Sequence, residues 1–512
     1  MTRPSLCVSP STSDPLTWIE DAIAFDPDAA VLETTDGAIL SYAELDRRAR
    51  AFAAALAAIG VAPGDRVLVQ VEKSLEAILL YLACLRLGAI FVPLNTGYTD
   101  AELGYFIADS EPRLLVVDPA READLQRLAA GRADVATLSA GGDGTLAVRA
   151  ASPTPALPRF AADADTLAAF LYTSGTTGRP KGAMLTRGNL ASNAATLAAA
   201  WHFTRDDVLI HALPLFHAHG LFVAVNTVLA AGASMLLMPR FDAREVLRLM
   251  PRATLFMGVP TYYVRLLEEA GLTRAATAGM RLFVSGSAPL LAETHREFEA
   301  RSGHVILERY GMTETLMNSS NPYLGARIAG TVGPPLPGIE MRVSAPETGE
   351  PLPNGEIGMI EVRGPNLFKG YWRNPEKTAA DMRADGFFVT GDLGLIDEAG
   401  YFHIVGRGKD LIISGGYNVY PKEVETELDA IGDIAESAVI GVPHADFGEA
   451  VVAVLVPEAG MAIDEAAVRA TLAGRLAKYK QPKAYAVYER LPRNAMGKVM
   501  KQQLRDELSD LF

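Results

Sequence analysis

The 512-residue sequence predicts an α/β protein with a large N-terminal domain and a small C-terminal domain. A chain of this length exceeds what one hydrophobic core supports, so at least two domains are expected. Short apolar segments alternate with helical patterns through the first part of the chain, which is typical of parallel-type sheets covered by helices. Hairpin-like segments begin near residue 330, and a shorter mixed pattern begins near residue 410. We therefore predict a β-hairpin-rich subdomain within the large domain and a small, mobile α+β domain at the C-terminus.

The strands expected in the first part are continuous apolar runs. They are residues 65–71, 89–94, 112–118, 166–173, 207–214, 233–239, 253–259 and 280–286. Two longer apolar runs, 75–94 and 219–239, approach the length of a membrane span. Gly88 and Gly232 interrupt them, so each is interpreted as a buried helix followed by a buried strand, and no stable membrane association is expected.

The remaining segments complete the predicted order of elements. Residues 131–165 are rich in Ala, Gly, Pro and Asp and predict a variable surface loop. Hairpin strands are expected within residues 330–343, 355–364, 386–397 and 401–413. The C-terminal pattern predicts a helix at 421–430, strands at 436–442 and 450–458, and a helix at 464–477. The polar turn Gly406–Asp410 separates two strand patterns, so the domains are predicted as 1–408 and 409–512.

Composition excludes several classes of function. The formal net charge is −14 and no long run of Lys or Arg is present, so a nucleic-acid-binding surface is not expected. Two cysteines, Cys7 and Cys84, do not indicate a disulfide framework and are compatible with a reducing compartment. The N-terminal segment has no apolar core of a secretory signal. A cytoplasmic location is therefore expected.

The segment LYTSGTTGRPKGAM, residues 171–184, contains the residue types of a phosphate-binding loop. It is not a Walker A loop, because Pro180 precedes Lys181 and Gly182 follows it. It follows a predicted strand and precedes a helix expected to begin near Thr186. Its hydroxyl, glycine and arginine residues are Ser174, Gly175, Thr176, Thr177, Gly178 and Arg179. Hydroxyls, closely approaching backbone N–H groups and cations can together surround a triphosphate.

This segment and four later ones resemble, in order, the motifs of the adenylate-forming superfamily. That superfamily includes acyl-CoA synthetases, aryl-CoA ligases, luciferases and peptide-synthetase adenylation domains. The later motifs are RYGMTET at 309–315, TGD at 390–392, GRGKDLIISGGYNVYPKEVE at 406–425 and PRNAMGKVMK at 492–501. The resemblance covers essentially the whole chain. It implies that a carboxylate attacks the α-phosphorus of ATP to give an acyl-adenylate and pyrophosphate, and that the thiol of coenzyme A then displaces AMP.

The resemblance also implies roles for individual residues. It assigns ATP and AMP binding to Thr173, Ser174, Gly175, Thr176, Thr177, Gly178, Lys181, Tyr310, Gly311, Asp392 and Arg407. Lys498 would contact the α-phosphate and the attacking carboxylate, Thr313 would donate to the α-phosphate, and Glu314 would hold Mg2+. The alternatives are an exposed lysine for Lys498 and a carboxylate at a helix N-terminus for Glu314.

The two half-reactions require different groups at one centre. Lys409 is the implied hinge about which the small domain turns, so that Lys498 leaves before the thiol arrives. The coenzyme A thiol arm is expected to pass Ser414, Gly415 and Gly416. The basic residues of the small domain, Lys478, Lys480 and Lys483, are interpreted either as contacts to coenzyme A phosphates or as a solvated charged face.

Four segments resemble malonyl-CoA synthetases in particular. They are residues 211–222, 283–298, 307–323 and 442–454. Malonate carries a second carboxylate, and an arginine provides the matching fork of donors. The implied substrate-binding residues are His217, Ala218, Ser287, Arg296 and Met317, with Arg296 as the carboxylate-binding arginine and His219 nearby. The small side chain of Ala218 leaves space for a 2-methyl group, so methylmalonate is also an expected substrate.

Three other functions remain open from the sequence. One is a ligase for another short-chain or aromatic acid, and a second is a stand-alone adenylation enzyme that loads a carrier protein. The third is a binding protein without activity, which the presence of Lys498, Glu314 and Asp392 disfavours. Because Lys498 lies on an exposed segment of the small domain, a lysine acetyltransferase that inactivates it is a possible partner.

Overall fold

The computed structural model describes residues 14–152, 157–173, 180–414, 417–444, 447–494 and 497–512. The chain forms two compact units, Met1–Glu340 with Val362–Phe388, and Met341–Glu361 with Val389–Phe512. Compactness therefore groups most of the hairpin-rich strands with the C-terminal region. The boundary at 408/409 marks the expected hinge and stays a prediction.

The first sheet of the first unit has six strands. Their order is β6 (Asp134–Thr137), β5 (Leu114–Val117), β3 (Arg66–Gln70), β4 (Ile90–Pro93), β7 (Leu167–Thr173) and β8 (Lys181–Thr186). All neighbouring pairs are parallel except β7 and β8. Strands β3, β4, β5 and β7 lie where the apolar runs predicted them, because both faces of a helix-covered parallel sheet are buried.

The second sheet of the first unit has eight strands. Their order is β14 (Leu316–Ser320), β13 (Leu307–Met312), β12 (Leu282–Ser285), β11 (Leu255–Gly258), β9 (Val208–His211), β10 (Ser234–Leu237), β1 (Ala30–Thr34) and β2 (Ile39–Ser41). The inner pairs are parallel and the two edge strands, β14 and β2, are antiparallel to their neighbours. The predicted α/β class with parallel-type sheets is confirmed.

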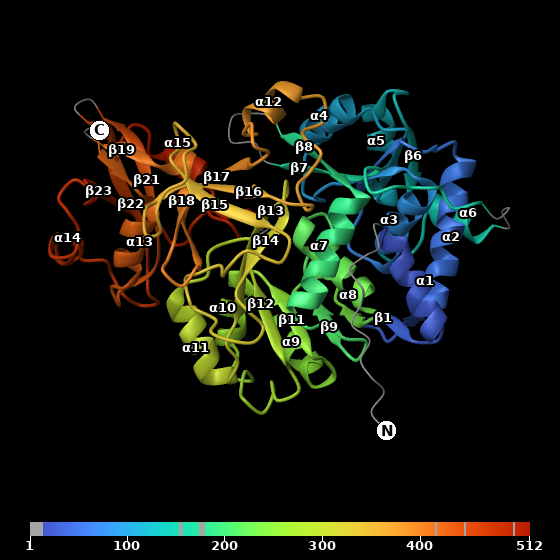
Figure 1. Cartoon of the computed structure of the whole chain (residues 1–512), viewed down its shortest axis with the longest axis horizontal. Coiled ribbons are helices and arrows are strands. Elements are labelled where there is room, and N and C mark those ends of the chain that lie inside the picture. Colours follow the sequence, from blue (N-terminus) through green and yellow to red (C-terminus); the bar gives the residue numbers. More distant parts are fainter. Residues whose placement is uncertain (1–13, 153–156, 174–179, 415–416, 445–446, 495–496) are drawn as a thin grey trace. The chain divides into compact units, whose positions relative to one another are not determined.

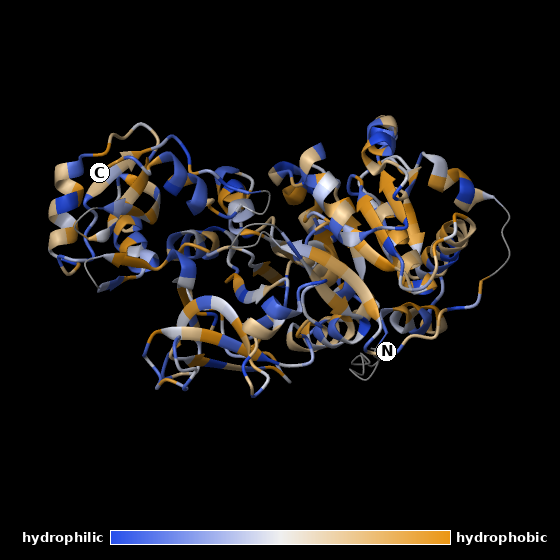
Figure 2. Ribbon diagram, turned by 90° about the horizontal axis from the view of Figure 1, so that it is seen from above, coloured by the Kyte–Doolittle hydropathy of each residue, from blue (hydrophilic) through white to orange (hydrophobic). Residues whose placement is uncertain are grey.

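Helices cover these sheets (Figure 1). They are α1 (Pro15–Phe25), α2 (Tyr42–Ala58), α3 (Leu75–Leu87), α4 (Asp100–Ser110), α5 (Glu122–Ala129), α6 (Thr145–Ala151), α7 (Arg187–Ala200), α8 (Asn226–Ala231), α9 (Ala243–Leu249), α10 (Pro260–Glu268), α11 (Ala292–Ser302) and α12 (Pro375–Ala380). One core lies between the six-stranded sheet and α4 and α5, around Phe106 and Phe170. Another lies between the eight-stranded sheet and α9, α10 and α11, around Phe256, Phe283 and Phe298. Figure 2 shows the sheet strands mainly in the hydrophobic colour.

Local sequence explains where key helices begin and end. The side chain of Thr186 accepts from the backbone N–H of Asn189 and caps α7, as the sequence predicted. Gly88 ends α3 and Gly232 ends α8, each in the left-handed conformation. The run 219–239 begins as a π-helix, His219–Val225, before α8. Among the helices of the described part of the chain, none combines the length and apolar character that a membrane crossing requires.

One sequence expectation in the first unit is wrong. Residues 131–165 contain strand β6 and helix α6 and are not a continuous surface loop. Pairing with β5 buries the side chains of Ala136 and Thr137, and the side chain of Leu146 on α6 is fully buried. Packing at the edge of the sheet therefore determines the structure of this segment, although its composition is typical of a loop.

A four-stranded sheet lies mainly in the second unit. Its strands are β15 (Glu340–Ser344), β16 (Gly358–Arg363), β17 (Phe388–Ile396) and β18 (Phe402–Arg407). The pair β17–β18 is antiparallel, as its hairpin pattern predicted. Residues 408–410 form a short 3-10 turn after β18.

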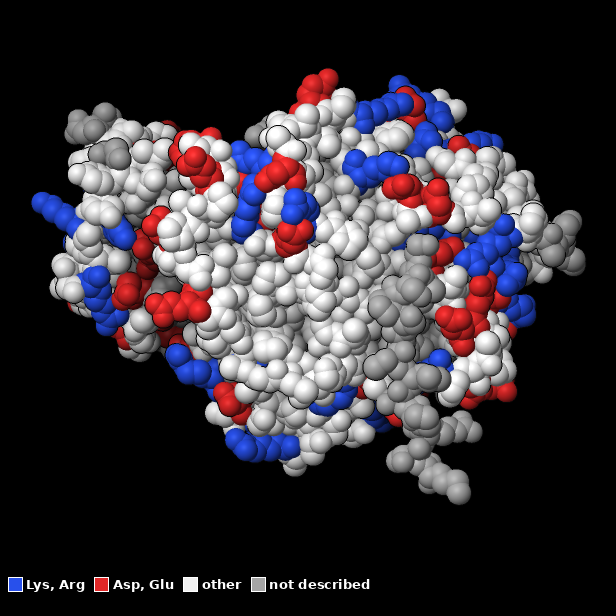
Figure 3. Space-filling view, viewed as in Figure 1, with Lys and Arg blue, Asp and Glu red and all other residues white. Residues whose placement is uncertain are grey.

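The C-terminal part of the second unit is the predicted α+β arrangement. Its sheet contains β19 (Ile412–Ser414), β20 (Tyr417–Val419), β21 (Ile434–His444), β22 (Gly448–Pro457) and β23 (Ala484–Val487). Its helices are α13 (Pro421–Asp429), α14 (Glu465–Ala473) and α15 (Lys501–Glu507). Helix α14 ends earlier than the sequence pattern suggested. On the face shown in Figure 3, basic and acidic side chains are interspersed.

Candidate active site

The predicted phosphate-binding segment lies between two paired strands. Thr173 ends β7 and Lys181 begins β8, and the two residues are direct partners in the antiparallel ladder. The predicted phosphate-binding residues Ser174, Gly175, Thr176, Thr177 and Gly178 lie outside the described residues, as does Arg179. The Lys181 ammonium is 5.5 Å from the centre of the Tyr371 ring. The structure thus places one cation and one hydroxyl side chain at the two ends of the segment.

The β13–β14 connection carries the next group of predicted residues. Tyr310 and Gly311 lie on β13, and Thr313 and Glu314 lie in the tight turn before β14. A side chain at Gly311 would meet the Leu316 carbonyl oxygen at 1.9 Å, so only glycine allows this connection. Thr313 is half-buried and Glu314 is buried. Thr313, the predicted α-phosphate contact, and Glu314, the predicted metal ligand, are therefore consecutive residues of one tight turn.

Tyr371 is a site residue that sequence reasoning missed. Its hydroxyl donates to Oε1 of Glu314 at 3.0 Å, and burial and the neighbouring Glu314 raise the pKa of Tyr371 far above its usual value. The tyrosine thus connects Lys181 to Glu314, because its ring faces the lysine and its hydroxyl faces the carboxylate. The segment FKGYW, residues 368–372, was the available signal in the sequence, but it shares no local pattern with the other motifs.

The Glu314 carboxylate suits a magnesium ion that is held mainly by phosphate oxygens. It is a hard oxygen donor, and Mg2+ commonly binds one or two protein carboxylates together with substrate phosphates. Within the described residues, no group of three or more His, Cys, Asp or Glu side chains could hold a metal. A metal at Glu314 would therefore depend on the nucleotide for its remaining ligands.

The acyl-side residues lie where the π-helix approaches the end of β12. His219 begins the π-helix, and its Nδ1 is 3.2 Å from the Ser287 hydroxyl. A side chain at Gly220 would meet the Pro214 carbonyl oxygen at 2.0 Å, so glycine is required beside His219. Ser287 itself has a φ of 73°, a strained left-handed conformation for a residue with a side chain. Strained backbone of this kind is concentrated at functional sites.

The histidines of this region are neutral. Burial lowers the pKa of His217 to about 4. Burial, and then the positive charge of Arg309, lower the pKa of His219 well below its usual value. Nε2 of each ring is buried without a hydrogen-bond partner in the described part of the chain. Two neutral imidazoles with free ring nitrogens are polar groups that a ligand could satisfy.

The remaining predicted acyl-pocket residues have different surroundings. Ala218 is half-buried between the two histidines, and Met317 is buried on β14. Arg296 is exposed on α11, and the structure does not bring it into the buried group around His219. Arg309 on β13, which was not among the predicted substrate residues, does lie in that group, since its charge acts on His219. The position of Arg309 in the RYGMTET motif was the available signal in the sequence, but the sequence does not show that the side chain of Arg309 is buried.

The second unit brings together the predicted ribose contacts and the predicted catalytic lysine. Asp392 and Arg407 are direct partners across β17 and β18, and Oδ1 of Asp392 is 2.6 Å from Nε of Arg407. Lys498 is exposed, yet desolvation of its ammonium group and the charge of Arg407 lower its pKa to about 8. Asp392, Asp410 and Lys409 also act on the Lys498 pKa. The residues predicted from three separate motifs thus form one charged cluster.

The predicted hinge and coenzyme A residues lie close to this cluster in the chain. Lys409 lies in the 3-10 turn, and burial lowers its pKa. Ser414 is buried at the end of β19, whereas Gly415 and Gly416 lie outside the described residues. Lys480 forms an ion pair with Glu423 at 2.8 Å, which favours the solvated charged face for this residue. Lys483 lies 4.0 Å from the centre of the Phe447 ring.

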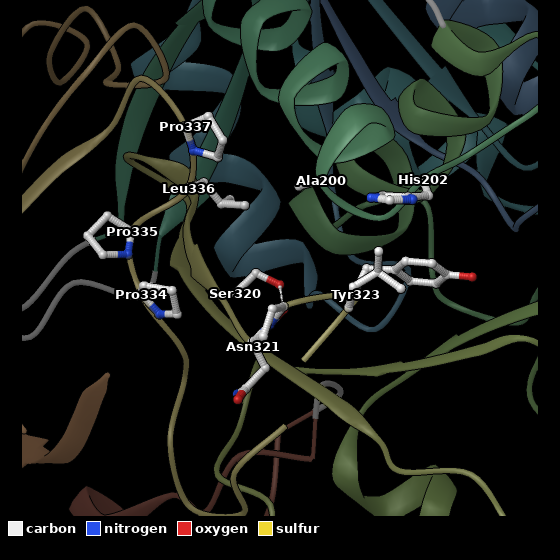
Figure 4. A pocket seen from close by; sticks show the side chains of 11 residues that line it. Ala200, His202, Ser320, Asn321, Tyr323, Pro334, Pro335, Leu336 and Pro337 are labelled. Atoms are coloured by element: carbon white, nitrogen blue, oxygen red, sulfur yellow. Dashed lines mark hydrogen bonds between the residues drawn. The ribbon is translucent and has the colours of Figure 1, made fainter. Parts of the chain in front are cut away.

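A cavity of about 250 Å³ lies apart from all the predicted residues (Figure 4). It is lined by the C-terminal end of α7, the segment after β14 and the proline-rich segment 334–337. His202 and Tyr323 face each other there, with ring centres 4.6 Å apart. Its lining contains none of the predicted catalytic side chains, so the chemistry is assigned to the two clusters above.

Comparison with known proteins identifies the family of this chain. Residues 19–372 match the family of AMP-binding enzymes, and residues 423–498 match the AMP-binding enzyme C-terminal domain. A feruloyl-CoA synthase of Amycolatopsis sp is 39% identical over 92% of this chain and 94% of its own. A malonate–CoA ligase of Arabidopsis thaliana is 36% identical over 88% of this chain and 79% of its own.

A solved structure shows the same fold. ATP-bound MatB from Rhodopseudomonas palustris is 56% identical, with a TM-score of 0.95, over 97% of this chain and 99% of that one. The predicted resemblance and fold class are confirmed. The chain therefore belongs to the AMP-binding enzyme family and is an ATP-dependent, AMP-forming CoA ligase.

Proposed function

We propose that this CoA ligase activates malonate, and also methylmalonate, to the corresponding CoA thioester with release of AMP and pyrophosphate. The observation that carries the proposal is the buried polar group at the acyl side, where His217, His219 and Ser287 replace the apolar lining that a fatty or aryl acid requires. Similarity to malonate–CoA ligases of Arabidopsis thaliana and Mus musculus supports it. Ala218 leaves space beside the substrate C2, and Met317 bounds that space.

In the proposed first half-reaction, the malonate carboxylate attacks the α-phosphorus of ATP. Lys498 neutralises charge at the α-phosphate, and Thr313 donates a hydrogen bond to it. Lys181 and the segment before it hold the outer phosphates, Tyr310 packs against the adenine, and Asp392 accepts from the ribose hydroxyls. Bound Mg2+ would neutralise phosphate charge, with Glu314 as its protein ligand.

In the proposed second half-reaction, the thiol of coenzyme A displaces AMP. Lys409 acts as the hinge, so that the segment containing Ser414, Gly415 and Gly416 replaces Lys498 at the reacting carbonyl. We also propose that acetylation of Lys498 stops adenylation and spares thioester formation, since it removes the charge of the ammonium. Mass spectrometry of the native protein tests this, and a Lys498 that is never acylated in any growth state would refute it.

Release of AMP in the presence of ATP and coenzyme A tests the substrate. Malonate, methylmalonate, acetate, octanoate, benzoate and ferulate are compared at equal concentration. We expect malonate to have the highest kcat/KM and methylmalonate to follow within about 10- to 200-fold, because one methyl group changes recognition by only 1–3 kcal/mol. A preference for ferulate would favour the alternative that the protein is an aryl-acid ligase. Ferulate is tested because a feruloyl-CoA synthase is 39% identical to this chain. Failure of coenzyme A as the sole acceptor would favour a carrier-protein-loading enzyme.

A further inference from the structure

Residues 366–372 contact the strand that begins at Lys181. They lie between β16 and α12 and, apart from a single bridge at Tyr371, belong to no strand or helix. The bridge is antiparallel and pairs Tyr371 with Ala183 on β8. Backbone hydrogen bonds of 2.7–3.0 Å also join the segment to Gly182 and Met184. Because β8 is an edge strand of the six-stranded sheet, these bonds cover its open edge and fix its position.

The same segment holds the turn between β13 and β14. The N–H of Phe368 donates to the Glu314 carbonyl at 2.8 Å. Nδ2 of Asn366 donates to the Thr315 carbonyl at 2.5 Å. Asn366 is only 1% exposed, so its hydrogen bond is shielded from water. Residues 366–372 therefore fix the backbone of the turn that carries the predicted metal ligand.

Tyr371 lies where these two sets of contacts meet. Its hydroxyl donates to Oε1 of Glu314, and the Lys181 ammonium lies near the centre of its ring. Its backbone N–H donates to the Thr378 hydroxyl at 2.9 Å, and the ring of Phe368 packs edge-on against its ring, with the centres 4.8 Å apart. Burial raises the pKa of Tyr371, so the hydroxyl stays protonated and acts as a donor. The side chain is thus held in one orientation between a cation and a carboxylate.

Two carboxylates act on the Tyr371 hydroxyl, and their surroundings differ. Asp381 is half-buried and forms an ion pair with Lys377, one turn earlier on the chain. Glu314 is buried and lies in the turn beside Thr313. A carboxylate has two acceptor oxygens, so a hydrogen bond to one oxygen sets the plane of the group and is compatible with metal binding. Tyr371 is therefore suited to orient Glu314.

We propose that Tyr371 is a positioning residue for the metal–nucleotide complex: its hydroxyl orients the Glu314 carboxylate toward Mg2+, and its ring holds the Lys181 ammonium beside the phosphates. This inference rests on the nucleotide roles proposed for Glu314 and Lys181 and does not depend on which acid is the substrate. An ammonium within about 6 Å of a ring centre is attracted to the ring face. Hydrogen-bond partners of a metal ligand orient that ligand, and they affect metal affinity although they do not touch the metal.

The test is the Mg2+ dependence of the full-length enzyme with Tyr371→Phe, which removes only the hydroxyl. Pyrophosphate release is measured at fixed ATP and varied Mg2+, and ATP binding is measured by calorimetry with and without Mg2+. We expect the Mg2+ concentration for half-maximal rate to rise by about 10- to 100-fold, as for loss of a partner that orients a metal ligand. Calorimetry should show a smaller gain in ATP affinity on addition of Mg2+ and an unchanged affinity without Mg2+, because the ring remains beside Lys181.

Two further measurements define the role of the ring and the side of the site affected. Tyr371→Leu, which also removes the ring, should weaken ATP binding in the absence of Mg2+ as well. Acid selectivity is measured as the malonate-to-propionate ratio of kcat/KM, since propionate has a methyl group in place of one carboxylate. This ratio should be unchanged in Tyr371→Phe.

A double-mutant cycle with Glu314→Gln tests whether Tyr371 acts through Glu314. If it does, adding Tyr371→Phe to Glu314→Gln should change the Mg2+ dependence little further. Tyr42→Phe is the matched control, because the Tyr42 hydroxyl is also buried and donates to the Ala233 carbonyl at 2.8 Å, outside the predicted site. It should lower the unfolding temperature as much as Tyr371→Phe does and leave the Mg2+ dependence unchanged.

Three results would overturn the inference. They are an unchanged Mg2+ dependence in folded Tyr371→Phe, full additivity in the double-mutant cycle, and an effect confined to the malonate-to-propionate ratio. An unchanged Mg2+ dependence in Glu314→Gln would refute the metal role of Glu314 and this inference with it. A wild type that prefers another acid refutes the proposed substrate alone, because the Mg2+ dependence is then measured with the preferred acid.

Discussion

The two clusters of polar residues, one around His219 in the first unit and one around Lys498 in the second, hold their charges in different ways. In the second unit, acids and bases are paired, as in Asp392 with Arg407 at 2.6 Å and Asp410 with Arg505 at 2.5 Å. In the first unit, Arg309 is buried beside neutral histidines and has no carboxylate partner in the described residues. The paired cluster is complete without a ligand, whereas the unpaired one is not. We therefore propose that the cluster around His219 serves the acid substrate and that the cluster around Lys498 serves the nucleotide chemistry.

Replacement of Lys498 should have the largest effect. The effect should be confined to adenylate formation, the half-reaction that we assign to the cluster around Lys498. We expect Lys498→Ala to reduce adenylate formation by about 1000-fold, which is typical for loss of one group that stabilises transition-state charge. Pyrophosphate release in single turnovers measures this step. Thioester formation from preformed malonyl-adenylate and coenzyme A should be retained. Arg490→Ala, at an exposed position of the same unit, is the control.

Equal loss of both half-reactions in Lys498→Ala would contradict the division of roles. A change in the malonate-to-propionate ratio in this variant would also show that the two clusters do not have separate tasks.

Breaking the ion pair between Asp392 and Arg407 should have a smaller effect than loss of Lys498, and this effect should be on KM for ATP. Asp392→Asn removes a charged acceptor for the ribose hydroxyls and leaves Arg407 without this partner. Hydrogen bonds to charged groups contribute about 1.5–3 kcal/mol, so KM for ATP should rise by about 10-fold or more. Initial rates at varied ATP concentration measure this, with malonate saturating. An unchanged KM for ATP together with altered acid selectivity would assign Asp392 to the acyl side instead.

The pH dependence should differ between the clusters. Lys498 must be protonated to neutralise phosphate charge, and its pKa is lowered to about 8. The kcat/KM for ATP should therefore fall as the pH rises above about 8, by up to about tenfold per unit. Lys498→Arg should move this decline to higher pH, because a guanidinium stays protonated.

Acid selectivity should not follow the same profile. The pKa of His217 is about 4, so this ring stays neutral between pH 6 and 8. The malonate-to-propionate ratio should be constant over that interval. A ratio that changes together with Lys498 titration would indicate one shared cluster rather than two.

Most of the fold could be predicted from the sequence. The apolar runs marked the inner strands of both sheets, and Gly88, Thr186 and Gly232 marked helix ends, because these signals are local. Strand β6 was not predictable, since its residues are polar in part and become a strand by pairing with β5. The division of the chain into units also depends on which hairpins pack together, which a local pattern does not reveal.

The candidate site was predictable only in part. The motifs led to the prediction of Lys181, Glu314, Asp392 and Lys498 as site residues, because each lies in a short segment with an unusual composition. Tyr371 was not identifiable, since its contact with Glu314 joins segments that are distant in the chain. Arg296 and Arg309 are equally basic in the sequence, and the exposure of one and the burial of the other arise from packing.

The sequence by itself therefore determined the chemical class of the protein, an adenylate-forming CoA ligase, because phosphate-binding and lysine-bearing motifs are contiguous in the chain. The tertiary structure alone decided which buried arginine has no acidic partner among the described residues. Burial and counter-ion distance depend on where β12, β13 and the π-helix meet, and those elements are far apart in sequence. The same packing that removes water from Arg309 leaves its Nε and Nη2 atoms without a hydrogen-bond partner among the described residues, whereas Arg187 has Asp14.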